Sequence, residues 1–173
     1  MYGIIYALLE NDIRRILSYS IVNQVGFMIV GIGIGTELSL NGTAAHAFSH
    51  IIYKGLLLMS AGSVIYMINK YKCTDVGGLY KTMPLTAICG IIGALAISAF
   101  PLTSGFISKS MIVDASIHEG MQLVWLMLLV GSAGVFLHAG IKFPWFVFFH
   151  RDKKIITTDP PIYMKYAMII AST

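Results

Sequence analysis

Two histidines and a lysine, His46, His50 and Lys54, follow one another at intervals of four residues within a long apolar stretch. On an α-helix this spacing gives one stripe that climbs about 12 Å along the axis, with Ser49 and Tyr53 beside it. Such a row can carry a proton when water bridges its members, because histidine titrates near neutral pH and burial favours neutral lysine. The alternative is that these groups only form hydrogen bonds between helices. Three ionisable groups at a regular spacing favour the proton path.

A second polar segment, from Phe100 to Lys109, interrupts another apolar stretch. Pro101 removes a backbone donor and clashes with the preceding turn, and Gly105 adds backbone freedom four residues later. We therefore predict that a helix over residues 83–113 is broken near residues 101–105. Unwound backbone within a membrane is tolerated only where it is buried in protein or lines a wet cavity, and such breaks often frame ion sites. Lys109 follows the break and would join the path; the alternative is a structural kink beside a lysine that reaches the membrane surface.

His138 and Lys142 form a weaker pair, again four residues apart and followed by Pro144. They either extend the proton path or mark the end of a span. The residues alone leave both interpretations open.

Other kinds of site are not indicated by the sequence. It contains no evident serine nucleophile, paired carboxylates or phosphate-binding loop, so we expect no catalytic residues and no independent enzyme activity. Cys73 and Cys89 lie sixteen residues apart without metal-ligand spacing, which predicts neither a disulfide framework nor a metal site. We expect no cofactor. The basic residues are scattered between apolar stretches, which argues against nucleic acid as a partner.

The composition indicates an integral membrane protein. Of its 173 residues 57% are hydrophobic and 12% are charged, and the mean hydropathy is +0.78. We predict an all-α, polytopic transmembrane helix bundle with one discontinuous helix. The expected spans are residues 16–35, 42–68, 83–113, 121–149 and a partial span over 162–173. The segments Glu10-Asn11-Asp12 and Asn41-Gly42-Thr43 are the expected helix caps, and residues 1–9 are interpreted as the end of a helix rather than a signal peptide.

The distribution of charge supports this division. If each span crosses once, the segments 10–15, 69–82 and 150–160 lie on one side, and they hold eight of the twelve basic residues. The segments 36–41 and 114–120, on the other side, hold Glu37, Asp114 and Glu119 without lysine or arginine. The positive-inside rule then places the basic side in the cytoplasm, or in the matrix of an organelle. Of the lysines within or beside the spans, Lys54 lies farthest from either surface.

These segments resemble the antiporter-like membrane subunits shared by respiratory complex I and the Mrp sodium/proton antiporters, with the D subunit of the Mrp type as the nearest match in wording. The resemblance is carried by NDIRRILSYSIVNQVGF (residues 11–27), HAFSHIIYKGLLLMSAGS (46–63), GGL (77–79) and FPLTSGFISK (100–109). It implies a fold of two inverted five-helix repeats, each with a broken helix, and a polar axis across the middle of the membrane. It also implies that Lys54 is the central lysine, that His46 and His50 lead to it, and that Lys109 is the terminal lysine.

The chain departs from this family in length. Family members are much longer, and the first repeat with its glutamate and lysine pair is missing, so we interpret the chain as a fragment truncated at both ends that covers the second half. A second chain could supply the first repeat.

The leading hypothesis is proton conduction as part of a cation/proton antiporter, with a proton-pumping subunit of an NADH:quinone oxidoreductase-like complex and a non-transporting remnant of a split gene as alternatives. The expected partners are the lipid bilayer, other subunits of such a complex, protons and Na⁺. We expect a bacterial plasma membrane, with an organellar inner membrane as the alternative.

Overall fold

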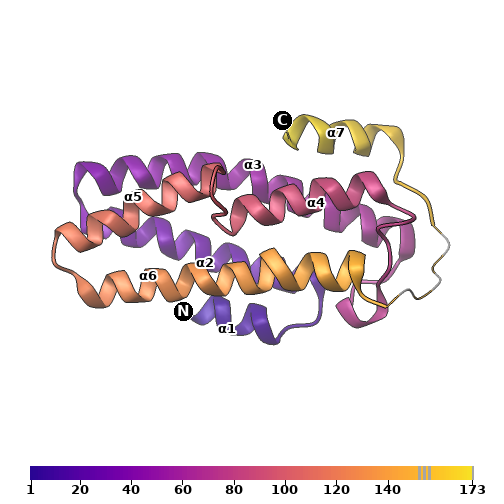
Figure 1. Ribbon diagram of the computed structural model, residues 1–173, viewed down its shortest axis with the longest axis horizontal. Coiled ribbons are helices and arrows are strands. Elements are labelled where there is room, and N and C mark those ends of the chain that lie inside the picture. The colour runs from indigo at the N-terminus through magenta and orange to yellow at the C-terminus, as the bar shows by residue number, and fades with distance from the viewer. Residues whose placement is uncertain (152, 154, 156, 173) are drawn as a thin grey trace.

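A computed structural model describes residues 1–151, 153, 155 and 157–172. The chain forms an elongated bundle of helices (Figure 1). The helices are α1 (Tyr2–Leu9), α2 (Ile13–Ile34), α3 (Glu37–Ile68), α4 (Pro84–Ile97), α5 (Ser104–His118), α6 (Gln122–Val135) and α7 (Ile162–Ser172). A short 3₁₀ turn covers Cys73–Asp75, and two π-helical segments, Phe136–Lys142 and Trp145–Phe149, continue α6. By length and composition α2, α3 and the continuous helix Gln122–Phe149 can each cross a membrane.

The starts of α2 and α3 are fixed by side chains that accept hydrogen bonds from the first exposed amides. The Asp12 carboxylate accepts from the Arg14 amide at 2.9 Å, as the sequence predicts. Gly35 ends α2 with a φ of 74°, and the Thr36 hydroxyl then accepts from the Ser39 amide at 3.2 Å. The expectation of a cap at residues 41–43 is wrong, because Thr36 already starts α3 directly after the left-handed glycine and those residues lie inside the helix.

The discontinuous helix consists of α4 and α5, which follow each other along α3 with a kinked connection between them (Figure 1). Pro101 lies in that connection, where Ala99 and Leu102 adopt positive φ angles of 57° and 72°. Gly105 does not lie in the unwound part, contrary to the expectation, because α5 already begins at Ser104. Its role is close packing: a Cβ at Gly105 would lie 2.0 Å from the Ala96 carbonyl oxygen, so only glycine lets α5 approach the end of α4.

Helix α3 lies at the centre of the bundle and packs against α2, α4, α5 and α7. The largest apolar cluster joins the start of α2, the second half of α3, the segment 73–83 and the π-helical end of α6. Its largest fully buried members are Ile13, Ile16, Leu17, Leu57, Leu79, Met83, Ile97, Phe143 and Phe148. The outer surface is also apolar: on α3, Phe48 and Ile51 are 71% and 72% exposed. Such a surface suits contact with lipid and agrees with an integral membrane protein.

The described parts of the three basic connecting segments gather at one end of the bundle (Figure 1). Asp12 pairs with Lys72 in an isolated antiparallel bridge, and the Asn11 amide group donates to the Thr74 hydroxyl at 3.0 Å. The third basic segment joins them where Lys153 donates to the Thr74 carbonyl oxygen. The turns at residues 35–36 and 119–121 lie at the opposite end. The fold therefore separates basic and acidic connections as the charge pattern predicts.

Candidate proton path

The stripe on α3 is buried. His46, His50, Tyr53 and Lys54 are 0%, 7%, 3% and 3% exposed, although Phe48 and Ile51 on the opposite face are open. The rings form a continuous row: the centroids of His46 and His50 are 6.1 Å apart, and those of His50 and Tyr53 are 5.5 Å apart. The four-residue spacing thus turns the polar side chains inward, as the helical period requires.

His46 connects α3 to two other helices. Its Nε2 lies 2.9 Å from Oε1 of Gln24 on α2, and its Nδ1 lies 3.0 Å from the hydroxyl oxygen of Ser108 on α5. Gln24 and Ser108 are 0% and 1% exposed. Sequence reasoning missed both residues. The available signals were an uncharged amide inside an apolar span and a serine directly before Lys109.

Lys109 lies on α5 just after the break, and its buried ammonium has a specific partner. Nζ donates to the carbonyl oxygen of Ile97, the last residue of α4, at 2.7 Å. It also lies 5.7 Å from the centroid of the Phe27 ring, which itself lies 6.1 Å from the His46 ring. The C-terminus of a helix carries partial negative charge, so the break provides a site that favours a cation. Lys109 therefore lies near the α3 stripe: Phe27 lies between it and His46, and the preceding residue, Ser108, contacts His46 directly.

Lys54 lacks such a partner. In the part of the chain that the structure describes, seven buried side-chain atoms have no hydrogen-bond partner: Ser20 Oγ, Asn23 Nδ2, Gln24 Nε2, His50 Nε2, Tyr53 Oη, Lys54 Nζ and His138 Nε2. Several of these atoms belong to the α3 row and to the part of α2 beside it. Buried polar atoms are normally satisfied by protein or by ordered water, so this grouping is the pattern expected along a hydrated path.

His138 and Lys142 do not act as one unit. His138 is buried, and its Nδ1 donates to the Gly134 carbonyl oxygen of its own helix at 2.7 Å. Lys142 instead donates to the carbonyl oxygens of Leu8 and Glu10 at 2.7 and 2.5 Å. Lys142 therefore holds the C-terminal end of α1 against α6, and only His138 still faces the bundle interior without a partner for Nε2.

Ser49 lies on the edge of the stripe rather than within it. It is half-buried, and together with Tyr53 it lines a cavity of about 400 Å³ bordered by α3, α4 and α7. Ser104, at the first residue of α5, lines the same cavity. The cavity therefore connects the side of the stripe with the helix break.

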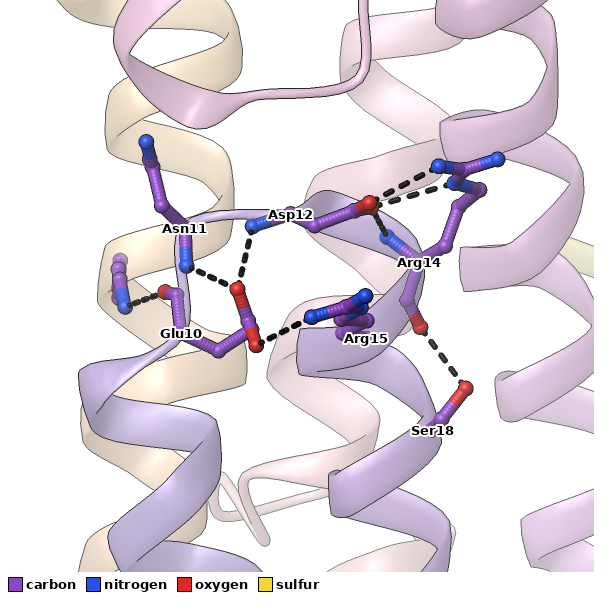
Figure 2. Close-up of polar contacts among 7 residues, drawn as sticks. Glu10, Asn11, Asp12, Arg14, Arg15 and Ser18 are labelled. Carbon is purple, nitrogen blue, oxygen red and sulfur yellow. Dashed lines mark hydrogen bonds and ion pairs between the residues drawn. The ribbon is translucent and has the colours of Figure 1, made fainter.

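Neither Lys54 nor Lys109 forms an ion pair with a carboxylate of the described residues. The two ion pairs of the described residues, Arg14 with Asp12 and Arg15 with Glu10, lie at the basic end of the bundle (Figure 2). There the backbone N–H groups of Asn11 and Asp12 donate to Glu10 and lower the pKa of its carboxyl. Hydrogen bonds from Arg14 lower the pKa of Asp12. At the same end, burial raises the pKa of the Cys73 thiol to about 11, so this cysteine stays protonated.

The chain is similar in sequence to subunits of known membrane complexes. Residues 1–137 match the family model described as the transmembrane region of NADH:quinone oxidoreductase and the Mrp antiporter. The chain is 38% identical over 117 residues to NADH-ubiquinone oxidoreductase chain 5 of Dictyostelium citrinum, with 67% of this chain and 17% of that protein covered. It is 35% identical over 136 residues to the D subunit of the Na⁺/H⁺ antiporter of Alkalihalophilus pseudofirmus, with 78% of this chain and 28% of that protein covered. The chain thus spans less than a third of the length of these relatives.

Two solved structures share the fold. A chain of the archaeal membrane-bound sulfane sulfur reductase, a respiratory membrane complex, matches with a TM-score of 0.92 and 33% identity, covering 99% of this chain and 29% of that one. A chain of the Mrp complex from Dietzia sp. matches with a TM-score of 0.88 and 19% identity, covering 99% of this chain and 40% of that one. Both belong to multisubunit membrane complexes.

Proposed function

Because the chain belongs to the NADH:quinone oxidoreductase/Mrp antiporter transmembrane family, we propose that it conducts protons across the bilayer as part of a cation/proton antiporter. The observation that carries this proposal is the buried row on α3, whose ionisable groups come within reach of Lys109 through His46 and Ser108. Buried lysines within membrane spans are costly and usually mark an ion path, and no ion pair of the described residues includes Lys54 or Lys109.

In the proposed path each residue has a distinct role. Lys54 binds and releases the proton, because its Nζ has no hydrogen-bond partner among the described residues to hold the charged form. His50 and His46 relay the proton along α3 toward α5. Lys109 then connects the path to the acidic side, since α5 leads from the break in mid-bundle to the turn at residues 119–121. Tyr53 and Ser49 are further candidates because both line the cavity beside α3, and His138 is another because it is buried with no partner for Nε2 among the described residues. Pro101 lies in the break beside Ile97, whose carbonyl oxygen accepts from Lys109.

Other subunits are the proposed partners, because both structural relatives belong to multisubunit membrane complexes. Na⁺ is the cation that we propose is exchanged for protons, since one relative is named as part of a Na⁺/H⁺ antiporter. A bacterial plasma membrane is the proposed location.

The test is a reconstituted, complete complex that carries Lys54→Ala in this chain. Proton uptake into proteoliposomes should fall at least about tenfold, because the central group of the row is lost, whereas Lys165→Ala, a half-buried lysine on α7 outside the row, should leave it unchanged. Assembly of both variants is checked by co-purification. Wild-type flux in the assembled Lys54→Ala complex would overturn the proposal.

A second candidate, a proton-pumping subunit of an NADH:quinone oxidoreductase-like complex, is favoured by the 38% identity to NADH-ubiquinone oxidoreductase chain 5. The energy source separates the two candidates. An antiporter responds to an imposed Na⁺ gradient in the absence of quinone reduction. A redox-driven subunit loses its proton flux when quinone reduction is stopped and does not respond to the Na⁺ gradient.

A further inference from the structure

The two contacts of His46 define which of its nitrogens carries a hydrogen. The amide oxygen of Gln24 can only accept a hydrogen bond, so Nε2 of His46, at 2.9 Å, must be the donor. A neutral imidazole carries one N–H, which leaves Nδ1 as an acceptor. The Ser108 hydroxyl, at 3.0 Å, then donates to Nδ1.

The distances around Ser108 favour this assignment over the reverse one. If the Gln24 amide were turned, its N–H would donate to Nε2, and Nδ1–H would donate to Ser108. The Ser108 hydrogen would then have only the Gly105 carbonyl oxygen, at 3.4 Å, in place of Nδ1 at 3.0 Å. A contact of 3.4 Å is long for an O–H donor, so the first arrangement uses the better geometry.

We infer that Gln24 and Ser108 are positioning residues that hold the hydrogen of neutral His46 on Nε2 and leave Nδ1, the nitrogen facing α5, to bind and release the transferred proton. The inference rests on the proposed function. A proton that arrives at Nδ1 forms one N–H bond and gives the ring a single positive charge. The new N–H donates to the Ser108 oxygen, and the Ser108 hydrogen turns to the Gly105 carbonyl oxygen. Release breaks the same N–H bond and restores the first arrangement, and Ser108 keeps its own hydrogen throughout.

The surroundings of His46 determine how strongly a proton on Nδ1 is repelled by other charged groups. His50 and Tyr53 lie along its own helix, and the residues that contact it from α2, Gln24 and Phe27, carry no charge. Lys109 is the cationic group on α5, the side toward which Nδ1 points. A proton on Nδ1 is therefore repelled most when Lys109 is charged, so the two sites should fill in alternation.

Nitrogen-15 NMR of histidine in the complete membrane complex tests the assignment directly, because protonated and bare ring nitrogens have different shifts. We expect the wild-type His46 ring at neutral charge to be protonated on Nε2. Gln24→Met removes the acceptor and should shift the major form to Nδ1–H. Asn23→Leu replaces a neighbouring buried amide on α2 and should leave the tautomer unchanged, because the hydrogen bonds of His46 go to Gln24 and Ser108. A wild-type ring protonated on Nδ1, or an identical tautomer in Gln24→Met, would overturn the inference.

Proton flux provides the second readout. Ser108→Ala should keep the Nε2–H tautomer, shift the Nδ1 resonance and slow the flux about fivefold, and Ser108→Cys, a weaker donor of similar shape, should recover part of the rate. Full flux in Ser108→Ala contradicts the role of Ser108. If the wild-type complex conducts no protons but shows the Nε2–H tautomer, the proposed function fails while the assignment of His46 stands.

Discussion

The two buried lysines differ in what their helices offer them. Lys54 lies in the middle of the continuous helix α3, whose interior carbonyl oxygens accept from amides four residues later, and its Nζ has no hydrogen-bond partner among the described residues. Lys109 lies beside the break between α4 and α5, and its Nζ donates to the free carbonyl oxygen of Ile97. Both are 3% exposed, so burial alone does not distinguish them.

This difference separates two tasks. A lysine without a partner gains little from staying charged, so it can exchange its proton readily. A lysine at a helix C-terminus is stabilised in its charged form by the carbonyl and by the helix dipole. An unbroken helix thus suits a group that exchanges its proton readily, and a broken helix suits a group that retains its proton longer before passing it on.

The largest loss of stability is expected where a side chain is added between α5 and the end of α4. Gly105→Ala places a methyl group 2.0 Å from the Ala96 carbonyl oxygen, which is backbone and cannot turn away. We expect the free energy of unfolding, measured by SDS titration in mixed micelles, to fall by about 3 kcal/mol. Gly62→Ala on α3 is the matched control, because no atom lies within 4 Å of its added Cβ. That variant should gain up to about 1 kcal/mol from helix propensity. Equal effects at the two positions would show that α4 and α5 are not closely packed at the break.

Replacing each lysine by methionine tests the comparison itself. Lys109→Met leaves the buried Ile97 carbonyl oxygen without its donor, which should cost about 2 kcal/mol of unfolding free energy in the same titration. Lys54→Met removes an amine that has no partner and should change stability by less than about 0.5 kcal/mol or increase it. Both variants should lose proton flux. A larger stability loss at Lys54 than at Lys109 would reverse the roles assigned to the two helices.

The smallest effect is expected at the basic end, outside the membrane. Asp12→Ala removes the cap of α2 and should cost about 1 kcal/mol. The pKa of Asp12 in the folded chain is lowered, chiefly by its hydrogen bonds with Arg14, and lies below the unfolded value of about 3.9. The carboxylate therefore stabilises the fold above that pH, and this contribution is lost as the pH falls through the folded pKa. Asp12→Asn keeps a capping oxygen without the charge, so its stability should show less dependence on acid. A wild-type acid profile in Asp12→Ala would contradict this account.

Part of the site follows from sequence alone. The interval of four residues places His46, His50 and Lys54 on one face of any helix. Pro101 disfavours a regular helix because it lacks an N–H and clashes with the preceding turn, although Pro144 lies inside the continuous helix Gln122–Phe149. The partners of His46 do not follow, because Gln24 is 22 residues away and Ser108 is 62 residues away, and only the packing of α2 and α5 against α3 brings them together.

The predictions that were wrong also depend on the structure around each residue, which a local sequence pattern does not show. Both Thr36 and the segment at residues 41–43 contain side chains that can cap a helix, and the left-handed Gly35 decides in favour of the earlier one. The sequence predicts that Gly105 loosens the backbone, but its lack of a side chain serves contact with α4. The role of Lys142 depends on the end of α1, 132 residues away at Glu10, which no local pattern reveals.

The contacts of Lys142 and Lys109 also affect where a free cation could bind to this chain. Carbonyl oxygens at helix C-termini are ligands that membrane transporters use for Na⁺. Here the end of α1 receives the ammonium of Lys142, and the end of α4 receives that of Lys109. Each helix end is therefore occupied by a tethered cation of the chain itself. A free ion could bind at either place only by displacing a lysine, which makes the two lysines built-in competitors of the metal ion.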